Sequence, residues 1–75
     1  MPFVNIKAVK GVMSEEDKTR LIAKVTDVVV EIAGRGSEEF RKGTWVVIEE
    51  IEPSHWGAGG KPVDLAAVRK LTGRS

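Results

Sequence analysis

Residues 14–33, SEEDKTRLIAKVTDVVVEIA, decide the fold, because this stretch predicts a single long amphipathic helix. Ser14 and Asp17 have the spacing of a capping box, in which a hydroxyl and an acidic side chain satisfy free backbone N–H groups at a helix start. Apolar residues then follow the 3.6-residue period of one helix face; they are Leu21, Ile22, Val25, Val28, Val29 and Ile32. Gly34 predicts the end of this helix, which we place at roughly residues 15–33.

A strand is predicted on either side of this helix. Residues 2–9, PFVNIKAV, alternate, and one face of the strand carries Val4, Ile6 and Ala8. Residues 44–51, TWVVIEEI, are apolar on both faces at their centre, as in a strand that is covered on both sides. A strand, a helix and a strand in this order predict a right-handed βαβ unit with parallel strands.

The remaining segments are shorter and more polar. Residues 34–43 form a polar connection with room for one turn of helix. Pro53 ends the second strand, and the segment WGAGG at residues 56–60 predicts a turn or hairpin. Residues 64–71 predict a short C-terminal helix. We therefore expect residues 1–75 to form a single α/β domain, a βαβ unit followed by a hairpin or a short helix.

Length and composition limit how such a unit can be stable. The chain has 75 residues, no cysteine and one histidine, which excludes disulfides and makes a histidine-based metal site improbable within one chain. A single core in a chain of this size seldom supplies more than about 3–5 kcal/mol. One helix also covers only one face of a two-stranded sheet, and two strands alone are not stable in water. Both arguments predict a homo-oligomer whose subunits complete each other's sheets.

The charge pattern excludes several classes of protein. Twelve basic and eleven acidic residues are interspersed and leave a net charge of +1. A nucleic-acid-binding domain would instead carry a basic stripe. No apolar run approaches the roughly 20 residues of a membrane span, and the N-terminal strand does not have the pattern of a signal peptide. We therefore expect a cytoplasmic protein with no nucleic-acid or membrane partner.

Pro2 is the candidate catalytic residue. A small second residue generally allows removal of Met1, which would leave the secondary amine of proline at the start of a strand. An apolar pocket or a neighbouring cation disfavours the charged amine and lowers its pKa. An amine whose pKa lies near the working pH is a competent general base. From the residues alone, the alternative is a proline that begins a strand without any chemical role.

Four segments together resemble the 4-oxalocrotonate tautomerase family over about residues 2–63. They are MPFVNIK at residues 1–7, Gly11, VVIEE at residues 46–50 and WGAGG at residues 56–60. The resemblance implies that Pro2 acts as a general base, which takes a proton next to a carbonyl and returns it elsewhere without a cofactor or a metal. It also implies subunits that pair through their sheets and an active site shared between neighbouring subunits. A hexamer is the favoured assembly, with a dimer or a trimer as alternatives.

Only some of the other family site residues have a match in this sequence. Trp56 matches a family aromatic residue that forms an apolar wall near the proline. Two family arginines that bind substrate carboxylates are absent, because Val12 and Trp45 hold their positions. Trp45 belongs either to the core or a subunit interface, or to an apolar substrate pocket with Trp56. Arg35 and Arg41 are either solvated charges or replacement anion contacts from a neighbouring subunit.

The predicted function is that of an isomerase, a cofactor-independent keto–enol tautomerase acting on a small 2-oxo acid or a similar carbonyl compound. One alternative is a different reaction of the same superfamily, such as dehalogenation or decarboxylation, which product analysis with haloacrylates would identify. The other alternative is a non-catalytic oligomeric binding protein. Retained Met1 would favour this last alternative, because it would block the amine of Pro2.

Overall fold

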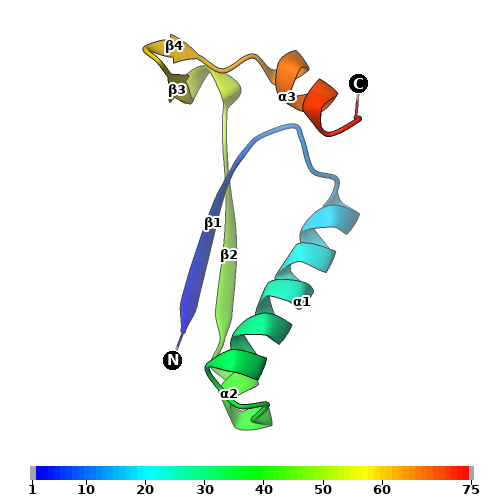
Figure 1. The fold of residues 1–75 in the computed structure, drawn as a ribbon, viewed down its shortest axis with the longest axis vertical. Coiled ribbons are helices and arrows are strands. Elements are labelled where there is room, and N and C mark those ends of the chain that lie inside the picture. The colour runs from blue at the N-terminus through cyan, green and yellow to red at the C-terminus, as the bar shows by residue number, and fades with distance from the viewer. Residues whose placement is uncertain (1, 75) are drawn as a thin grey trace.

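The computed structural model describes residues 2–74, so the predicted removal of Met1 concerns a residue outside the described part of the chain. Strand β1, Phe3–Val9, and strand β2, Trp45–Ile51, pair in parallel, with Phe3 opposite Trp45 and Val9 opposite Ile51. Helix α1, Glu15–Ile32, connects them and runs along one side of the sheet (Figure 1). The predicted βαβ unit is confirmed, and each predicted boundary lies within one residue of the observed one.

Helix α1 begins as its sequence predicts. The Ser14 Oγ accepts a hydrogen bond from the Asp17 backbone N–H, and the Asp17 Oδ2 accepts one from the Ser14 backbone N–H, both at 3.0 Å. These two bonds form a complete capping box. Glu15, Glu16 and Asp17 also place negative charge at the positive end of the helix dipole.

The predicted apolar stripe of α1 is only partly buried. Val30, which lies outside that stripe, is the buried hydrophobic residue of the described chain, with 4% of its surface exposed. Val28 and Ile32, which belong to the stripe, are largely exposed. Two strands lie only about 5 Å apart, whereas a helix with its side chains is about 10 Å wide. A two-stranded sheet is therefore too narrow to cover the whole stripe.

Helix α1 ends beside Gly34, but this glycine has a different role from the predicted one. The left-handed backbone conformations near the helix end belong to Arg35, with φ 50°, and Gly36, with φ 79°. Glycine is required at position 34 because the Phe40 ring packs closely against its backbone, and a Cβ atom here would lie 2.4 Å from that ring. Phe40 belongs to α2, Glu38–Lys42, the predicted turn of helix in the polar connection.

The sheet face that points away from α1 is uncovered, as predicted. Along both strands, exposed residues alternate with half-buried residues, and the exposed positions include Phe3, Trp45 and Val47. The chain is also elongated, measuring 43 × 24 × 17 Å with a radius of gyration of 15.1 Å. A compact domain of this length has a radius of gyration of about 11 Å. The fold therefore leaves short sheets that oligomerisation would complete.

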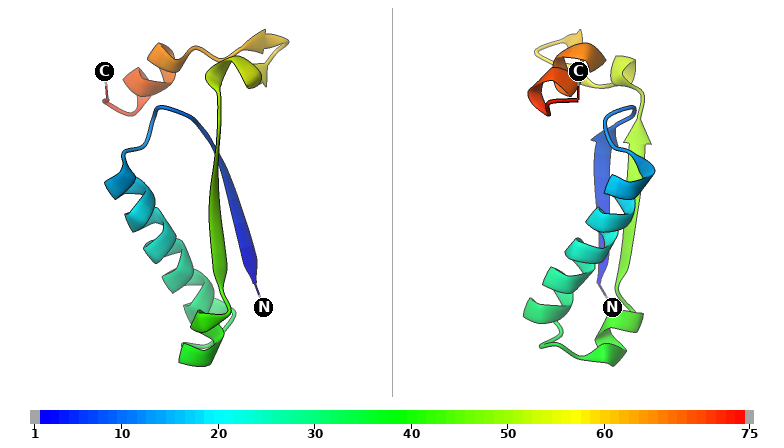
Figure 2. Two further views of the ribbon diagram at one scale, coloured as in Figure 1. Left: turned by 180° about the vertical axis from the view of Figure 1, so that it is seen from behind. Right: turned by 90° about the vertical axis from the view of Figure 1, so that its right-hand side faces the viewer.

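The C-terminal third forms both a hairpin and a short helix. After the 3-10 turn η1, Pro53–His55, the two-residue strands β3, Gly57–Ala58, and β4, Lys61–Pro62, pair antiparallel. Helix α3, Leu65–Leu71, follows and is capped by the Asp64 side chain, which accepts a bond from the Ala66 N–H at 3.1 Å. Two views show this segment at the end of the sheet where the β1–α1 connection lies (Figure 2).

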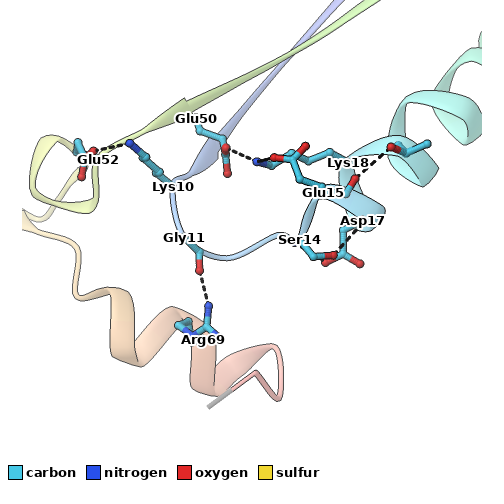
Figure 3. Close-up of polar contacts among 10 residues, drawn as sticks. Lys10, Gly11, Ser14, Glu15, Asp17, Lys18, Glu50, Glu52 and Arg69 are labelled. Atoms are coloured by element: carbon cyan, nitrogen blue, oxygen red, sulfur yellow. Dashed lines mark hydrogen bonds and ion pairs between the residues drawn. The ribbon is translucent and has the colours of Figure 1, made fainter.

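Helix α3 is held in place by contacts with the β1–α1 connection. The Arg69 guanidinium donates a hydrogen bond to the carbonyl oxygen of Gly11 (Figure 3). Gly11 has φ 96°, and a Cβ atom there would lie 3.1 Å from the Leu65 side chain. Arg74 binds the Asp17 carboxylate at 2.6 Å. Within residues 2–74, no helix is both long enough and apolar enough to cross a bilayer.

Candidate active site

Pro2 occupies a defined position at the start of β1. Its carbonyl oxygen accepts a hydrogen bond of 3.1 Å from the backbone N–H of Trp45, and the residue is half-buried. Because this bond fixes Pro2 against the first residue of β2, the proline is part of the sheet edge. The start of β1 lies at the same end of the molecule as α2 (Figure 1).

Two exposed aromatic side chains flank this position. Trp45 lies directly opposite Phe3 in the parallel register, and both point to the uncovered face of the sheet. Trp45 is 65% exposed and Phe3 is 62% exposed. The structure therefore brings Trp45 next to Pro2, but not into the core of this chain.

Phe3 is a site neighbour that was not predicted as such. The predicted parallel βαβ unit could have indicated this position, because the first residues of two paired parallel strands lie side by side.

Charged residues appear on the uncovered face only farther along the strands. Lys7 and Glu49 are register partners, and the Lys7 Nζ lies 3.9 Å from the Glu49 Oε1. The Asn5 amide donates to the same carboxylate oxygen at 3.4 Å. On this face, the two register pairs nearest Pro2 are Phe3–Trp45 and Asn5–Val47, and neither carries a charge. The surface beside Pro2 is consequently aromatic and neutral.

The opposite face of the sheet carries an ion pair with α1. The Lys18 Nζ lies 2.6 Å from the Glu50 Oε1 and 3.3 Å from the Glu15 Oε1 (Figure 3). The hydrogen bond to Glu50 raises the pKa of the Lys18 ammonium above its ordinary value. Lys18 is therefore protonated at neutral pH, and its contacts are structural, between the helix and β2.

Arg35 and Arg41 lie at the α2 end of the molecule, as Pro2 does, but they are directed to the helix side. The Arg41 Nη2 forms an ion pair with the Asp27 Oδ1 at 2.7 Å. Both arginines line a cavity of about 450 Å³ together with Asp27, Glu31 and Glu38. Since three carboxylates surround two guanidinium groups, this cavity has little net attraction for an anion. Their predicted role as anion contacts stays a prediction.

Trp56 lies at the opposite end of β2 from Pro2. It follows η1, and its carbonyl oxygen accepts a hydrogen bond from the Val63 N–H at 2.9 Å, which closes the hairpin. The seven residues of β2 span about 20 Å at roughly 3.3 Å per residue. Within one chain, Trp56 therefore does not approach the Pro2 that precedes its own β1.

The indole nitrogen of Trp56 has an unusual environment. Trp56 Nε1 is buried, and within residues 2–74 it has no hydrogen-bond partner. A buried donor without an acceptor costs about 1–3 kcal/mol. At the end of β1, the Lys10 Nζ forms an ion pair with the Glu52 Oε1 at 3.1 Å (Figure 3).

A cavity of about 510 Å³ lies at the Trp56 end of the sheet, between the β1–α1 connection and α3. Its apolar lining includes Val9, Val12, Met13, Leu21 and Val68. The sequence did not predict this cavity, because it depends on α3 folding back over the β1–α1 connection. Among residues 2–74, no group of three His, Cys, Asp or Glu side chains is placed to hold a metal ion.

This architecture is that of small tautomerases in solved structures. A structure from a study of the 4-oxalocrotonate tautomerase isozymes of Methylibium petroleiphilum superposes with a TM-score of 0.70 and 30% identity, covering 97% of this chain and 100% of that one. The structure of SAR1376, a putative 4-oxalocrotonate tautomerase from methicillin-resistant Staphylococcus aureus, gives a TM-score of 0.66 and 38% identity, covering 81% and 90%.

Sequence comparison agrees with the structural likeness. The chain is 41% identical over 63 residues to the probable tautomerase K2 of Dickeya dadantii (strain 3937), which covers 84% of this chain and 88% of that relative. The family model described as "Tautomerase enzyme" matches residues 2–66. The chain belongs to the tautomerase family.

Proposed function

We propose that this protein is a cofactor-independent keto–enol tautomerase in which Pro2 is the general base. The observation that carries the proposal is the position of Pro2 in a chain of this family: it precedes β1 directly and is fixed to β2 by the Trp45 N–H bond. The substrate class is a 2-oxo acid or a similar carbonyl compound in its enol form. The nitrogen takes the enol proton, and a proton is returned to the neighbouring carbon, so that the double bond moves without an external oxidant or reductant.

The surroundings of Pro2 favour a neutral amine. An α-amino group has a pKa near 7.7–8.0, and the secondary amine of proline is intrinsically more basic. Apolar surroundings disfavour the charged form and lower the pKa towards the working pH. Phe3 and Trp45 supply aromatic surface next to Pro2 within the same chain. Trp56 of a neighbouring subunit would supply the second wall.

A homo-oligomer is part of this proposal, with a hexamer as the favoured assembly. The elongated chain leaves one sheet face uncovered, and Trp56 lies about 20 Å of strand away from Pro2. A site that uses both residues must take them from different chains.

The test is a ketonisation assay with phenylenolpyruvate or 2-hydroxymuconate. Pro2→Ala should lower kcat/KM by about 100-fold or more, since general-base catalysis contributes roughly 10²–10⁴-fold. Mass spectrometry of the wild type should show that Met1 is removed.

A matched control keeps the pyrrolidine ring but blocks its nitrogen. A variant with one extra residue retained ahead of Pro2 turns the amine into an amide, and it should lose activity to the same extent. If Pro2→Ala and the wild type have equal rates, the general-base role is wrong.

Arg35 and Arg41 are proposed as anion contacts offered to a neighbouring subunit. Arg41 would have to exchange its Asp27 partner for the substrate, whereas Arg35 is exposed. Single alanine variants identify which arginine binds the substrate: the KM should rise for the variant that has lost the anion contact. If both variants keep the wild-type kcat/KM on an anionic substrate, neither residue binds it.

A further inference from the structure

The cavity of about 510 Å³ lies at the end of β1 that is farthest from the Pro2 of the same chain. It is on the helix side of the sheet, because Ala8 of its lining belongs to the half-buried face of β1 and Leu21 belongs to α1. The cavity is therefore not part of the uncovered face through which the sheets would pair. Another wall comes from α3, which lies almost entirely beyond residues 2–66, the part of the chain that the tautomerase family model matches.

The interior of this cavity is apolar but not closed. Its apolar residues are all half-buried rather than buried: Ala8, Val9, Val12, Met13, Leu21 and Val68. Apolar surface that stays in contact with water favours a partner that removes it from water. Cavities that hold small molecules measure roughly 300–1,000 Å³ and combine an apolar lining with a few polar groups. The size and lining of this cavity fit a small molecule with a hydrocarbon part.

The rim of the cavity carries positive charge without a carboxylate partner. Arg20 and Lys24 both line the cavity, and within residues 2–74 neither forms an ion pair. They are four residues apart on α1, so two like charges lie side by side on one helix face, which is unfavourable. The carboxylate among the described lining residues, Asp17, is already bound to Arg74 at 2.6 Å. An anion between Arg20 and Lys24 would relieve their repulsion and accept charge-assisted hydrogen bonds.

From this apolar interior and its cationic rim we propose that the cavity binds an amphipathic monocarboxylate, a hydrocarbon chain with one carboxylate at its end. The carboxylate lies between Arg20 and Lys24, and the chain runs along Leu21 towards Val68 of α3. The lining residues of α1 extend from Asp17 to Lys24, about 10 Å at roughly 1.5 Å per residue, which is the length of an extended chain of about eight carbons. This site is separate from the chemistry proposed for Pro2 and does not depend on it.

Calorimetric titration of the assembled wild-type protein tests both parts of the ligand. Octanoate should bind at least about tenfold more tightly than acetate, which has the charge without the chain. It should also bind at least about tenfold more tightly than octanol, which lacks the charge, and octyltrimethylammonium, which reverses it. Equal affinities for octanoate and octyltrimethylammonium would show that the cationic rim does not bind the ligand, and the proposal would be wrong.

The methyl signal of Met13 tests the location of the site. Methionine occurs only at positions 1 and 13, so a protein labelled at its methionine methyl groups gives few signals. The Met13 signal should shift with added octanoate and saturate at the concentration found by calorimetry. A Met13 signal that stays constant while octanoate binds would place the ligand elsewhere and overturn the proposal.

Charge and volume variants test the two halves of the cavity. Lys24→Glu should weaken octanoate binding at least about tenfold and strengthen the binding of octyltrimethylammonium. Lys61→Glu is the matched control, because it makes the same change of charge in β4, outside the cavity lining, and it should leave both affinities unchanged. Val68→Trp fills the apolar part of the cavity and should abolish octanoate binding. If Val68→Trp fails to fold, the comparison of Lys24→Glu with Lys61→Glu decides the question.

Activity measurements keep this site separate from the active site. Lys24→Glu should retain the wild-type kcat/KM for phenylenolpyruvate, and Pro2→Ala should retain the wild-type affinity for octanoate. If Lys24→Glu loses ketonisation together with octanoate binding, the cavity belongs to the active site and a separate site is wrong. A wild type that binds no octanoate also overturns the proposal. If Lys24→Glu or Val68→Trp then changes the molar mass measured by light scattering, a neighbouring subunit covers the cavity instead.

Discussion

Gly34→Ala tests how tightly α2 packs against the end of α1. An added Cβ atom would lie 2.4 Å from the Phe40 Cδ2, 2.5 Å from its Cγ and 2.9 Å from its Cβ. Rotation about χ2 could move Cδ2 away and rotation about χ1 could move Cγ, but Cβ moves only when the backbone of α2 shifts. Overpacking of this kind costs about 1–3 kcal/mol. We expect a loss of about 2 kcal/mol in the free energy of unfolding.

Gly57→Ala is the matched control for this prediction. A Cβ atom at Gly57 meets nothing within 4 Å. Both substitutions restrict the unfolded chain to a similar extent, so the difference between them isolates the clash with Phe40. For a domain of 60–100 residues, 1 kcal/mol changes Tm by about 4–8 °C, and Gly34→Ala should melt about 8–16 °C below Gly57→Ala.

Urea unfolding and thermal melting must be compared at one protomer concentration, because association makes Tm concentration-dependent. Replacing Phe40 by alanine in the Gly34→Ala background should reduce the penalty of the added methyl group, because Cδ2 and Cγ are removed while Cβ, at 2.9 Å, stays. A double-mutant cycle measures this reduction. If Gly34→Ala and Gly57→Ala differ by less than about 0.5 kcal/mol, the close packing of Phe40 on Gly34 is not a feature of the protein in solution.

Two further predictions concern the start of α1. Ser14→Ala should lower the free energy of unfolding by about 1 kcal/mol in urea titrations, whereas Ser54→Ala, an exposed serine in η1, should change it far less. The hydrogen bond from the Ser14 backbone N–H, and secondly the one from Arg74, lower the pKa of the Asp17 carboxyl in the folded state. The ionised Asp17 therefore contributes to stability above about pH 4, and this contribution is lost as the pH falls through the folded-state pKa. Asp17→Asn should therefore flatten the loss of stability below about pH 4, and an acid unfolding curve with the same slope as the wild type would contradict this contribution.

The secondary structure of this chain was predictable because its signals are local. The capping box and the 3.6-residue period define α1 within its own 18 residues, and residue alternation defines β1. The packing of α1 was less predictable, since it depends on the width of the surface that covers the helix. Periodicity selected Val28 and Ile32, yet two strands reach only part of that stripe, and Val30 is the buried residue.

The candidate site was predictable only in part, because its arrangement also depends on contacts between segments that are distant in the sequence. The alternation of residues 2–9 placed Phe3 on the uncovered face, but only the parallel register shows that Phe3 and Trp45 adjoin. The pairing of Arg41 with Asp27 follows from the position of α2 against α1, which no local pattern of the sequence specifies. Trp56 remained unplaced relative to Pro2 for a further reason. One chain carries them at opposite ends of β2, and only the proposed oligomer would bring a Pro2 and a Trp56 together.

The separation of Pro2 and Trp56 along one chain also has a genetic consequence. In the proposed oligomer, when two defective alleles are expressed together, a subunit that lacks Pro2 would still supply its Trp56 to the site of a neighbour, and a subunit that lacks Trp56 would still supply its Pro2. Some sites in such mixed particles contain both intact residues. Alleles damaged at opposite ends of β2 should therefore complement each other, whereas two alleles damaged at the same end should not.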